Sequence, residues 1–115
     1  MPGGKFPLSV AEKHKLFSAA PASRADLKRW GDVYREKGLL HDSLEFYQRA
    51  GDEEGIRSLS EPAVEGADLV LLQNVWAALK LPVPTDALNR FQERAAALGK
   101  DAVAHRASLL LVPSR

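Results

Sequence analysis

The sequence predicts an all-α protein of about six antiparallel helices, arranged as a short α-solenoid or helical bundle. Three observations predict this class. Apolar residues recur at the spacing of a helical face over most of the chain. No segment shows the sustained alternation with β-branched residues that is typical of a strand. The connections between helical segments are short, so we expect consecutive helices to be antiparallel neighbours.

Length and composition indicate a single domain. The chain has 115 residues, of which 45% are hydrophobic and 27% are charged, as in ordinary globular domains. We expect one helical domain over residues 9–112, a flexible N-terminal tail over residues 1–8 and a C-terminal tail over residues 113–115. No apolar run has the length of a signal peptide or of a membrane span, so we expect a soluble cytoplasmic protein without a membrane partner.

The first helix is expected over residues 10–19. Ser9 and Glu12 have the spacing of a capping box, in which each side chain accepts a hydrogen bond from the backbone amide of the other residue. Pro21 disfavours helical backbone at the residue before it, so the helix should end there.

Two further helices follow. Ser23 begins one that runs to Lys37 and stops at Gly38, and its apolar face carries Leu27, Trp30, Val33 and Tyr34. Asp42 is expected to cap a short third helix that carries Leu44, Phe46, Tyr47 and Ala50. The pair Gly51-Asp52 interrupts this helix, and Ile56 and Leu59 belong to one or two further turns.

The C-terminal half should hold the remaining helices. The longest is expected over residues 61–80, although Gly66 leaves open a separate first turn. A Pro-rich linker at residues 81–84 ends it. The next helix begins at Thr85-Asp86, buries Leu88, Phe91 and Leu98, and stops at Gly99. Asp101 opens the last helix, which carries Val103 and Leu109 to Leu111.

Residues 24–57 carry a pattern of small and large side chains that suits a close helical hairpin. Gly31, Ser43 and Ala50 allow the two helices to approach, and the space between them would be filled by Trp30, Tyr34 and Tyr47. The pattern positions resemble those of a tetratricopeptide repeat (TPR): Leu27, Trp30, Gly31, Tyr34, Ser43, Tyr47, Ala50 and Gly55. Gly55 stands where that family has proline, which suggests that the second helix ends early.

Two alternatives to this repeat remain open. The same spacings fit an ordinary helical bundle or a clathrin-like helical repeat. A second copy of the repeat is only partly matched, because Ala87 and Phe91 follow Ser43 and Tyr47 at an offset of 44 residues. Whether the second and third helix pairs are true repeats stays open at this point.

The sequence nominates no catalytic, cofactor or metal site. The chain has no cysteine, and His14, His41 and His105 have no ligand spacing relative to one another. No nucleophile elbow, P-loop or dinucleotide-binding pattern is present. The acids from Asp52 to Glu54 are typical of a helix N-terminus, and Trp30 and Trp76 of core packing. We therefore expect a protein that is not an enzyme and has no cofactor.

The resemblance to TPR proteins implies a non-enzymatic protein-protein interaction module, a scaffold or adaptor that binds a peptide or protein segment. By position, the groove-facing residues would be Lys28, Asp32, Arg35 and Glu36. Lys28 stands where clamp-type co-chaperone repeats have a lysine that binds a partner's carboxylate. Asp32 stands where those repeats have asparagine, and an acid there repels a carboxylate. The resemblance therefore implies a partner surface of mixed charge.

The sequence also suggests a nucleic-acid function and a homodimer. Residues 1–37 contain eight basic and four acidic residues, which would suit a nucleic-acid-associated protein. Asp26, Asp32 and Glu36 lie among these cations and dilute their field, so nucleic acid is the alternative partner. A homodimer could form through the apolar face around Leu72, Val75 and Trp76, although that face is equally expected to be core.

Overall fold

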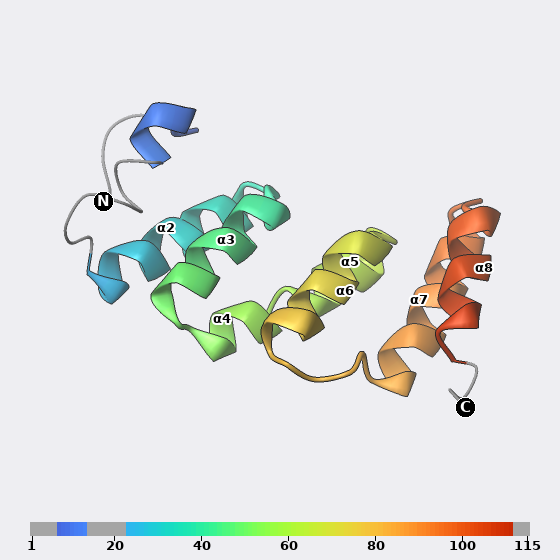
Figure 1. Ribbon diagram of the computed structural model, residues 1–115. Coiled ribbons are helices and arrows are strands. Elements are labelled where there is room, and N and C mark those ends of the chain that lie inside the picture. The colour runs from blue at the N-terminus through green and yellow to red at the C-terminus, as the bar shows by residue number, and fades with distance from the viewer. Residues whose placement is uncertain (1–6, 14–22, 112–115) are drawn as a thin grey trace. The chain divides into compact units, whose positions relative to one another are not determined.

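The described residues belong to the all-α class, as the sequence predicts. A computed structural model describes residues 7–13 and 23–111, and these form helices and no strand (Figure 1). The contacts divide the chain into two compact units, Met1–Gly55 and Ile56–Arg115. The single domain expected over residues 9–112 stays a prediction. The C-terminal tail and most of the N-terminal tail lie outside the described residues.

Helix α2, Arg24–Glu36, begins and ends as the sequence predicts. Ser23 is the N-cap, and its side chain accepts a 3.1 Å hydrogen bond from the Asp26 amide. Gly38 follows the helix with a φ of +79°, the left-handed conformation that glycine adopts without steric cost.

Helix α3, Leu40–Ala50, differs from the prediction at its start. Its N-cap is Leu39, whose side chain makes no capping hydrogen bond, and not Asp42. Asp42 lies within the first turn, and its carboxylate forms an ion pair with Lys13 instead. The helix ends at Gly51, and the short helix α4, Glu53–Arg57, accounts for the further turn expected there.

The two helices of this hairpin enclose an aromatic core. The ring centroid of Phe46 lies 6.2 Å from that of Trp30 and 5.2 Å from that of Tyr34. Leu27 and Ala50 complete this cluster of buried side chains. Phe46, rather than the Tyr47 of the repeat pattern, therefore packs between Trp30 and Tyr34.

The described part of the first expected helix is the turn at residues 10–13. Its capping box is confirmed, because the Ser9 amide donates to the Glu12 carboxylate at 2.9 Å and the Glu12 amide donates to Ser9 Oγ at 3.1 Å. The remainder of the helix expected over residues 10–19, including His14, lies in the part that the structure does not describe.

In the second unit the long helix expected over residues 61–80 is two helices, α5, Ser60–Glu65, and α6, Leu69–Ala78. The chain turns at Ala67, which has a φ of 51°, and Asp68 then caps α6 by accepting a 3.0 Å hydrogen bond from the Leu71 amide. The separate first turn that Gly66 left open is therefore present. Ser60 does not cap α5; its hydroxyl accepts a 3.0 Å hydrogen bond from the Trp76 indole.

Helices α7, Thr85–Ala97, and α8, Asp101–Leu109, form the last pair, and α5 packs on α7. Leu88 and Phe91 are buried as expected, but Leu98 is 44% exposed, because it follows the last turn and Ala95 takes the inward position. Arg90 of α7 forms two hydrogen bonds, 2.6 and 2.8 Å long, with the Glu61 carboxylate of α5.

The apolar face considered for a homodimer lies in the interior of the second unit. Leu72 and Val75 are fully buried and Trp76 is nearly so. These side chains therefore belong to the core. Core packing was one of the two alternatives that the sequence left open for this face, and a dimer interface was the other. The exposed large apolar side chains of this unit are elsewhere: Val70, Leu81, Leu98, Leu109 and Leu110.

Candidate functional site

The site begins with the packing of Tyr47 between two glycines. A Cβ added at Gly31 would lie 2.6 Å from Tyr47 Cε1, and one added at Gly55 would lie 2.6 Å from Tyr47 Cδ1. Both distances are too short for real carbon contacts, so a side chain at either position would displace the ring. Gly55, where the TPR pattern has proline, is thus explained by the ring that lies against it.

Polar groups fix the hairpin at the same level. The Ser43 hydroxyl donates a buried 2.7 Å hydrogen bond to the Gly31 carbonyl. The Tyr47 hydroxyl donates a 2.5 Å hydrogen bond to Asp32. Burial raises the pKa of the Tyr47 hydroxyl above its usual range, and the hydrogen bond to the Asp32 carboxylate raises it further. The phenol therefore remains protonated at neutral pH and acts as a donor that orients Asp32.

Asp32 belongs to a group of four charged side chains linked by ion pairs, and we call Lys28, Asp32, Arg35 and Asp52 the polar cluster. Lys28 Nζ lies 3.6 Å from Asp32 and 3.4 Å from Asp52. The Arg35 guanidinium lies 3.7 Å from Asp32 and 5.8 Å from the centroid of the Tyr47 ring. Two cations and two carboxylates therefore balance each other in formal charge.

The cluster has an exposed rim and a buried base. The Lys28 side chain is 54% exposed, whereas the Asp52 side chain is only 16% exposed. Asp52 Oδ1 accepts a 3.0 Å hydrogen bond from the Gly55 amide, while the buried Oδ2 has no hydrogen-bond partner and is compensated by the ion pair with Lys28. Lys28 therefore presents its ammonium at the surface while Asp32 and Asp52 hold it in place. The guanidinium of Arg35 is partly exposed and is held by Asp32.

The structure brings together three of the four residues that the sequence nominated. Lys28, Asp32 and Arg35 are in contact, since they follow one another by four and three residues on α2. Glu36 is exposed at the end of α2, and among the described residues it has no ion pair with the cluster. Sequence reasoning missed Asp52, although an Asp three residues before a Gly at a helix start indicates a carboxylate held by backbone amides.

The titratable groups of the cluster are engaged by their neighbours. The Tyr47 phenol is held protonated, and the carboxylates of Asp32 and Asp52 are engaged by cations or amides. The exposed Lys28 and the partly exposed Arg35 can donate hydrogen bonds to carbonyl or carboxylate groups of a partner, and Asp32 can accept them.

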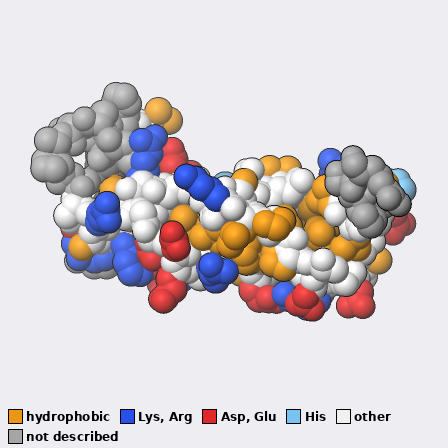
Figure 2. All heavy atoms as spheres, turned by 60° about the horizontal axis from the view of Figure 1, so that its bottom comes forward, with side chains coloured by type: hydrophobic (Ala, Val, Ile, Leu, Met, Phe, Trp, Pro, Cys, Tyr) orange, Lys and Arg blue, Asp and Glu red, His pale blue; other side chains and the backbone are white. Residues whose placement is uncertain are grey.

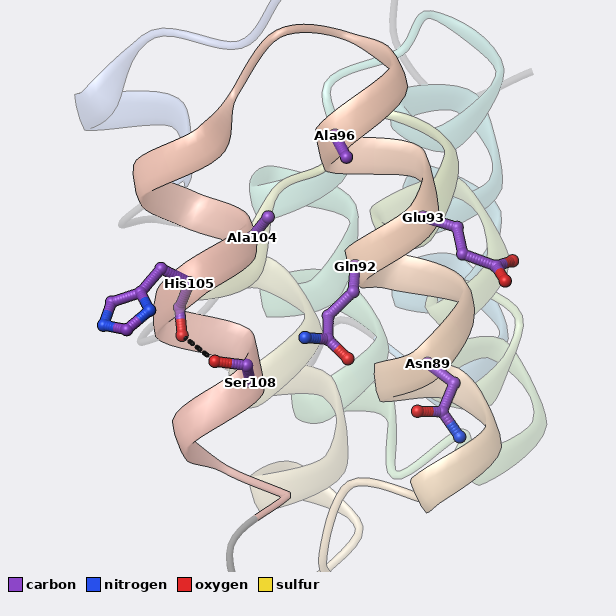
Figure 3. A pocket seen from close by; sticks show the side chains of 7 residues that line it. All are labelled: Asn89, Gln92, Glu93, Ala96, Ala104, His105 and Ser108. Atoms are coloured by element: carbon purple, nitrogen blue, oxygen red, sulfur yellow. Dashed lines mark hydrogen bonds between the residues drawn. The ribbon is translucent and has the colours of Figure 1, made fainter.

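A second feature is an open groove of about 660 Å³ between α7 and α8. Figure 3 shows Gln92 pointing into the space between the two helices, opposite Ser108, and Ala96 and Ala104 on its upper walls. The Ser108 hydroxyl donates a 2.5 Å hydrogen bond to the His105 carbonyl (Figure 3). His105 is exposed.

Four of the described basic residues of the N-terminal third, Lys13, Lys28, Arg29 and Arg35, are paired with acids. Lys13 lies against Asp42, Lys28 against Asp32 and Asp52, and Arg29 against Asp26. Figure 2 shows acidic side chains next to Lys and Arg side chains on the face that it draws. This arrangement reduces the positive field that phosphate binding requires.

The described residues contain neither a metal-ligand group nor a membrane-spanning helix. In the part of the chain that the structure covers, no three His, Asp or Glu side chains are grouped so as to hold a metal ion. Within the same residues, no helix combines the length and the apolar character needed to cross a membrane.

Comparison with known proteins adds no family. No protein-family model, no curated protein and no solved structure matches this chain.

Proposed function

We propose that this chain is a non-enzymatic protein-protein interaction module that binds a peptide or protein segment on the polar-cluster side of α2, as a TPR-like repeat would. The observation that supports the proposal is the polar cluster itself, in which the exposed Lys28 and the partly exposed Arg35 are held by Asp32, Asp52 and Tyr47. A surface ordered before binding loses less side-chain entropy when the partner arrives.

The balanced charge of the cluster favours a partner segment that itself carries both signs. A carboxylate of the partner would meet Lys28 or Arg35, and an amide or cation would meet Asp32. We propose the cytoplasm as the place where this module acts, in keeping with a sequence without cysteine.

The test compares two double variants of α2 that change the net charge equally. Lys28→Glu with Arg35→Glu removes the exposed cations of the cluster, whereas Arg29→Glu with Lys37→Glu alters cations outside it. Each variant and the native chain is used in quantitative cross-linking with proteins of the source cell. We expect partners of the native chain to be lost at least about tenfold from the first variant and kept by the second.

Two outcomes would contradict the proposal. One is a native chain that captures no protein above a tag-only control. The other is a cluster variant that keeps every partner while its helical content is unchanged by circular dichroism. Lys28→Gln with Arg35→Gln repeats the test without placing new negative charge beside Asp32 and Asp52.

A further inference from the structure

The aromatic core of the α2–α3 hairpin is covered on one side by residues 7–13 of the same chain. Leu8 packs against the cluster of Leu27, Trp30, Tyr34, Phe46 and Ala50. The Leu8 amide donates a 2.7 Å hydrogen bond to the Tyr34 hydroxyl, although the two residues are 26 positions apart. The hairpin thus presents an apolar surface with a hydroxyl acceptor, and a short segment is seated on it.

A pocket for a cation adjoins this surface. Lys13 forms an ion pair with Asp42, and its Nζ lies 3.8 Å from Glu45. The same ammonium lies 5.3 Å from the centroid of the Tyr34 ring and 5.8 Å from that of Phe46. Two carboxylates and two aromatic faces therefore surround one charge, and the Lys13 side chain is only 19% exposed.

The capping box explains why Leu8 and Lys13 reach the hairpin together. Ser9 is the cap of the turn and Glu12 its third residue, so Leu8 precedes the cap and Lys13 is the fourth residue of the turn. Side chains at these two positions lie side by side, which is the geometry of a hydrophobic staple. The surface therefore fits the capped N-terminus of a helix that has an apolar residue before the cap and a lysine five positions after that residue.

We propose that this face of the hairpin is a docking site for such a helix N-terminus, occupied in cis by residues 7–13 and in trans by a partner helix with the same apolar-x4-lysine pattern. The contacts of Leu8 and Lys13 with the hairpin hold this segment in place. Its attachment to α2 makes cis occupancy an intramolecular equilibrium, with an effective concentration on the order of millimolar. A partner helix binds when it outcompetes that equilibrium.

The test weakens the cis segment in the full chain and offers the same segment in trans. Lys13→Glu places a third carboxylate beside Asp42 and Glu45 and should release residues 7–13. Lys37→Glu is the matched control, since Lys37 is exposed and has no ion pair among the described residues. The probe is a fluorescent peptide with the sequence of residues 7–13, and a second peptide carries Glu in place of its lysine. Fluorescence anisotropy measures binding.

We expect the Lys13→Glu chain to bind the lysine peptide at least about tenfold more tightly than the native chain and the Lys37→Glu chain, and none of them to bind the Glu peptide. Exchange of the Leu8 amide should also become faster in the Lys13→Glu chain. Equal peptide affinity for all three chains at unchanged helical content overturns the proposal. If Lys13→Glu lowers helical content, Lys13→Gln replaces it with the same expected direction. A native dimer that exchanges this segment, detected by sedimentation, would overturn the cis assignment.

Discussion

At the scale of single residues, Tyr47 joins the packing of the hairpin to its charged surface. Its ring lies between Gly31 and Gly55, and its hydroxyl holds Asp32. The sequence pattern predicted a small residue at position 31 and an aromatic one at 47, because those types recur in close helical hairpins. It did not predict that position 55 must also lack a side chain, since this follows from the turn that brings α4 back against the ring.

This packing makes Gly31→Ala a sharp test of the hairpin. The new methyl would lie 2.6 Å from Tyr47 Cε1, and the ring also lies against Gly55 while its hydroxyl is bound to Asp32. Overpacking of this kind costs about 1–3 kcal/mol, which outweighs the gain of about 1 kcal/mol in helix propensity. We expect a lower urea midpoint for this variant than for the native chain.

Gly66→Ala is the matched control for that substitution. A Cβ there would meet its nearest neighbour, the Pro62 carbonyl, at 3.4 Å, and the residue has an ordinary negative φ of −88°. Its urea midpoint should stay close to that of the native chain. Equal midpoints for Gly31→Ala and the native chain would mean that Tyr47 does not pack as described.

At the scale of elements, the helix ends explain what the sequence could and could not predict. Helices α2, α3 and α7 are followed by glycines with positive φ, and these ends were predicted at Gly38, Gly51 and Gly99. Helices α5 and α6 are followed by Ala67 and Lys80 in the same left-handed conformation. A pattern that reads glycine as the stop signal passes over the Ala67 turn, which is why one helix was predicted over residues 61–80.

Lys80 therefore offers a stabilising substitution. Its φ is 59°, and the next amide, that of Leu81, donates a 3.0 Å hydrogen bond to the Trp76 carbonyl, as in a glycine-type helix end. A left-handed conformation costs a non-glycine residue roughly 1–2 kcal/mol, and glycine removes this cost at some loss of chain entropy. We expect Lys80→Gly to raise the free energy of unfolding by about 0.5–1 kcal/mol in chemical denaturation.

Lys37→Gly provides the comparison, because Lys37 also ends a helix and is exposed, but its φ is −86°. Glycine relieves no strain there and should lower stability slightly. If both substitutions changed stability in the same direction and by the same amount, the conformation at Lys80 would not be the cause.

At the scale of the molecule, ion pairs join basic and acidic residues that lie in separate stretches of the sequence. The sequence separates basic and acidic stretches along the chain, with two basic and eight acidic residues over 38–79. Folding of the first unit brings members of both stretches together, as in the pairs Lys13–Asp42 and Lys28–Asp52. Spacing on α2 alone could predict the contacts of Lys28, Asp32 and Arg35, whereas Asp52 reaches them only through the turn after α3.

This pairing leads to a prediction about nucleic acid, the alternative partner. A protein that binds phosphates releases counterions, so its affinity falls steeply as salt is raised. The paired cations of the first unit would have to exchange their carboxylate partners for phosphates. The loss of these ion pairs offsets most of the free energy gained from counterion release. The test titrates the native chain with duplex and single-stranded probes of about 20 nucleotides at roughly 50 and 200 mM salt. We therefore expect at most weak binding, with an affinity that changes little between the two salt concentrations. A loss of affinity of about 10³-fold between those salt concentrations would mean that six or more phosphates are neutralised, and the nucleic-acid function would then replace the protein-binding one.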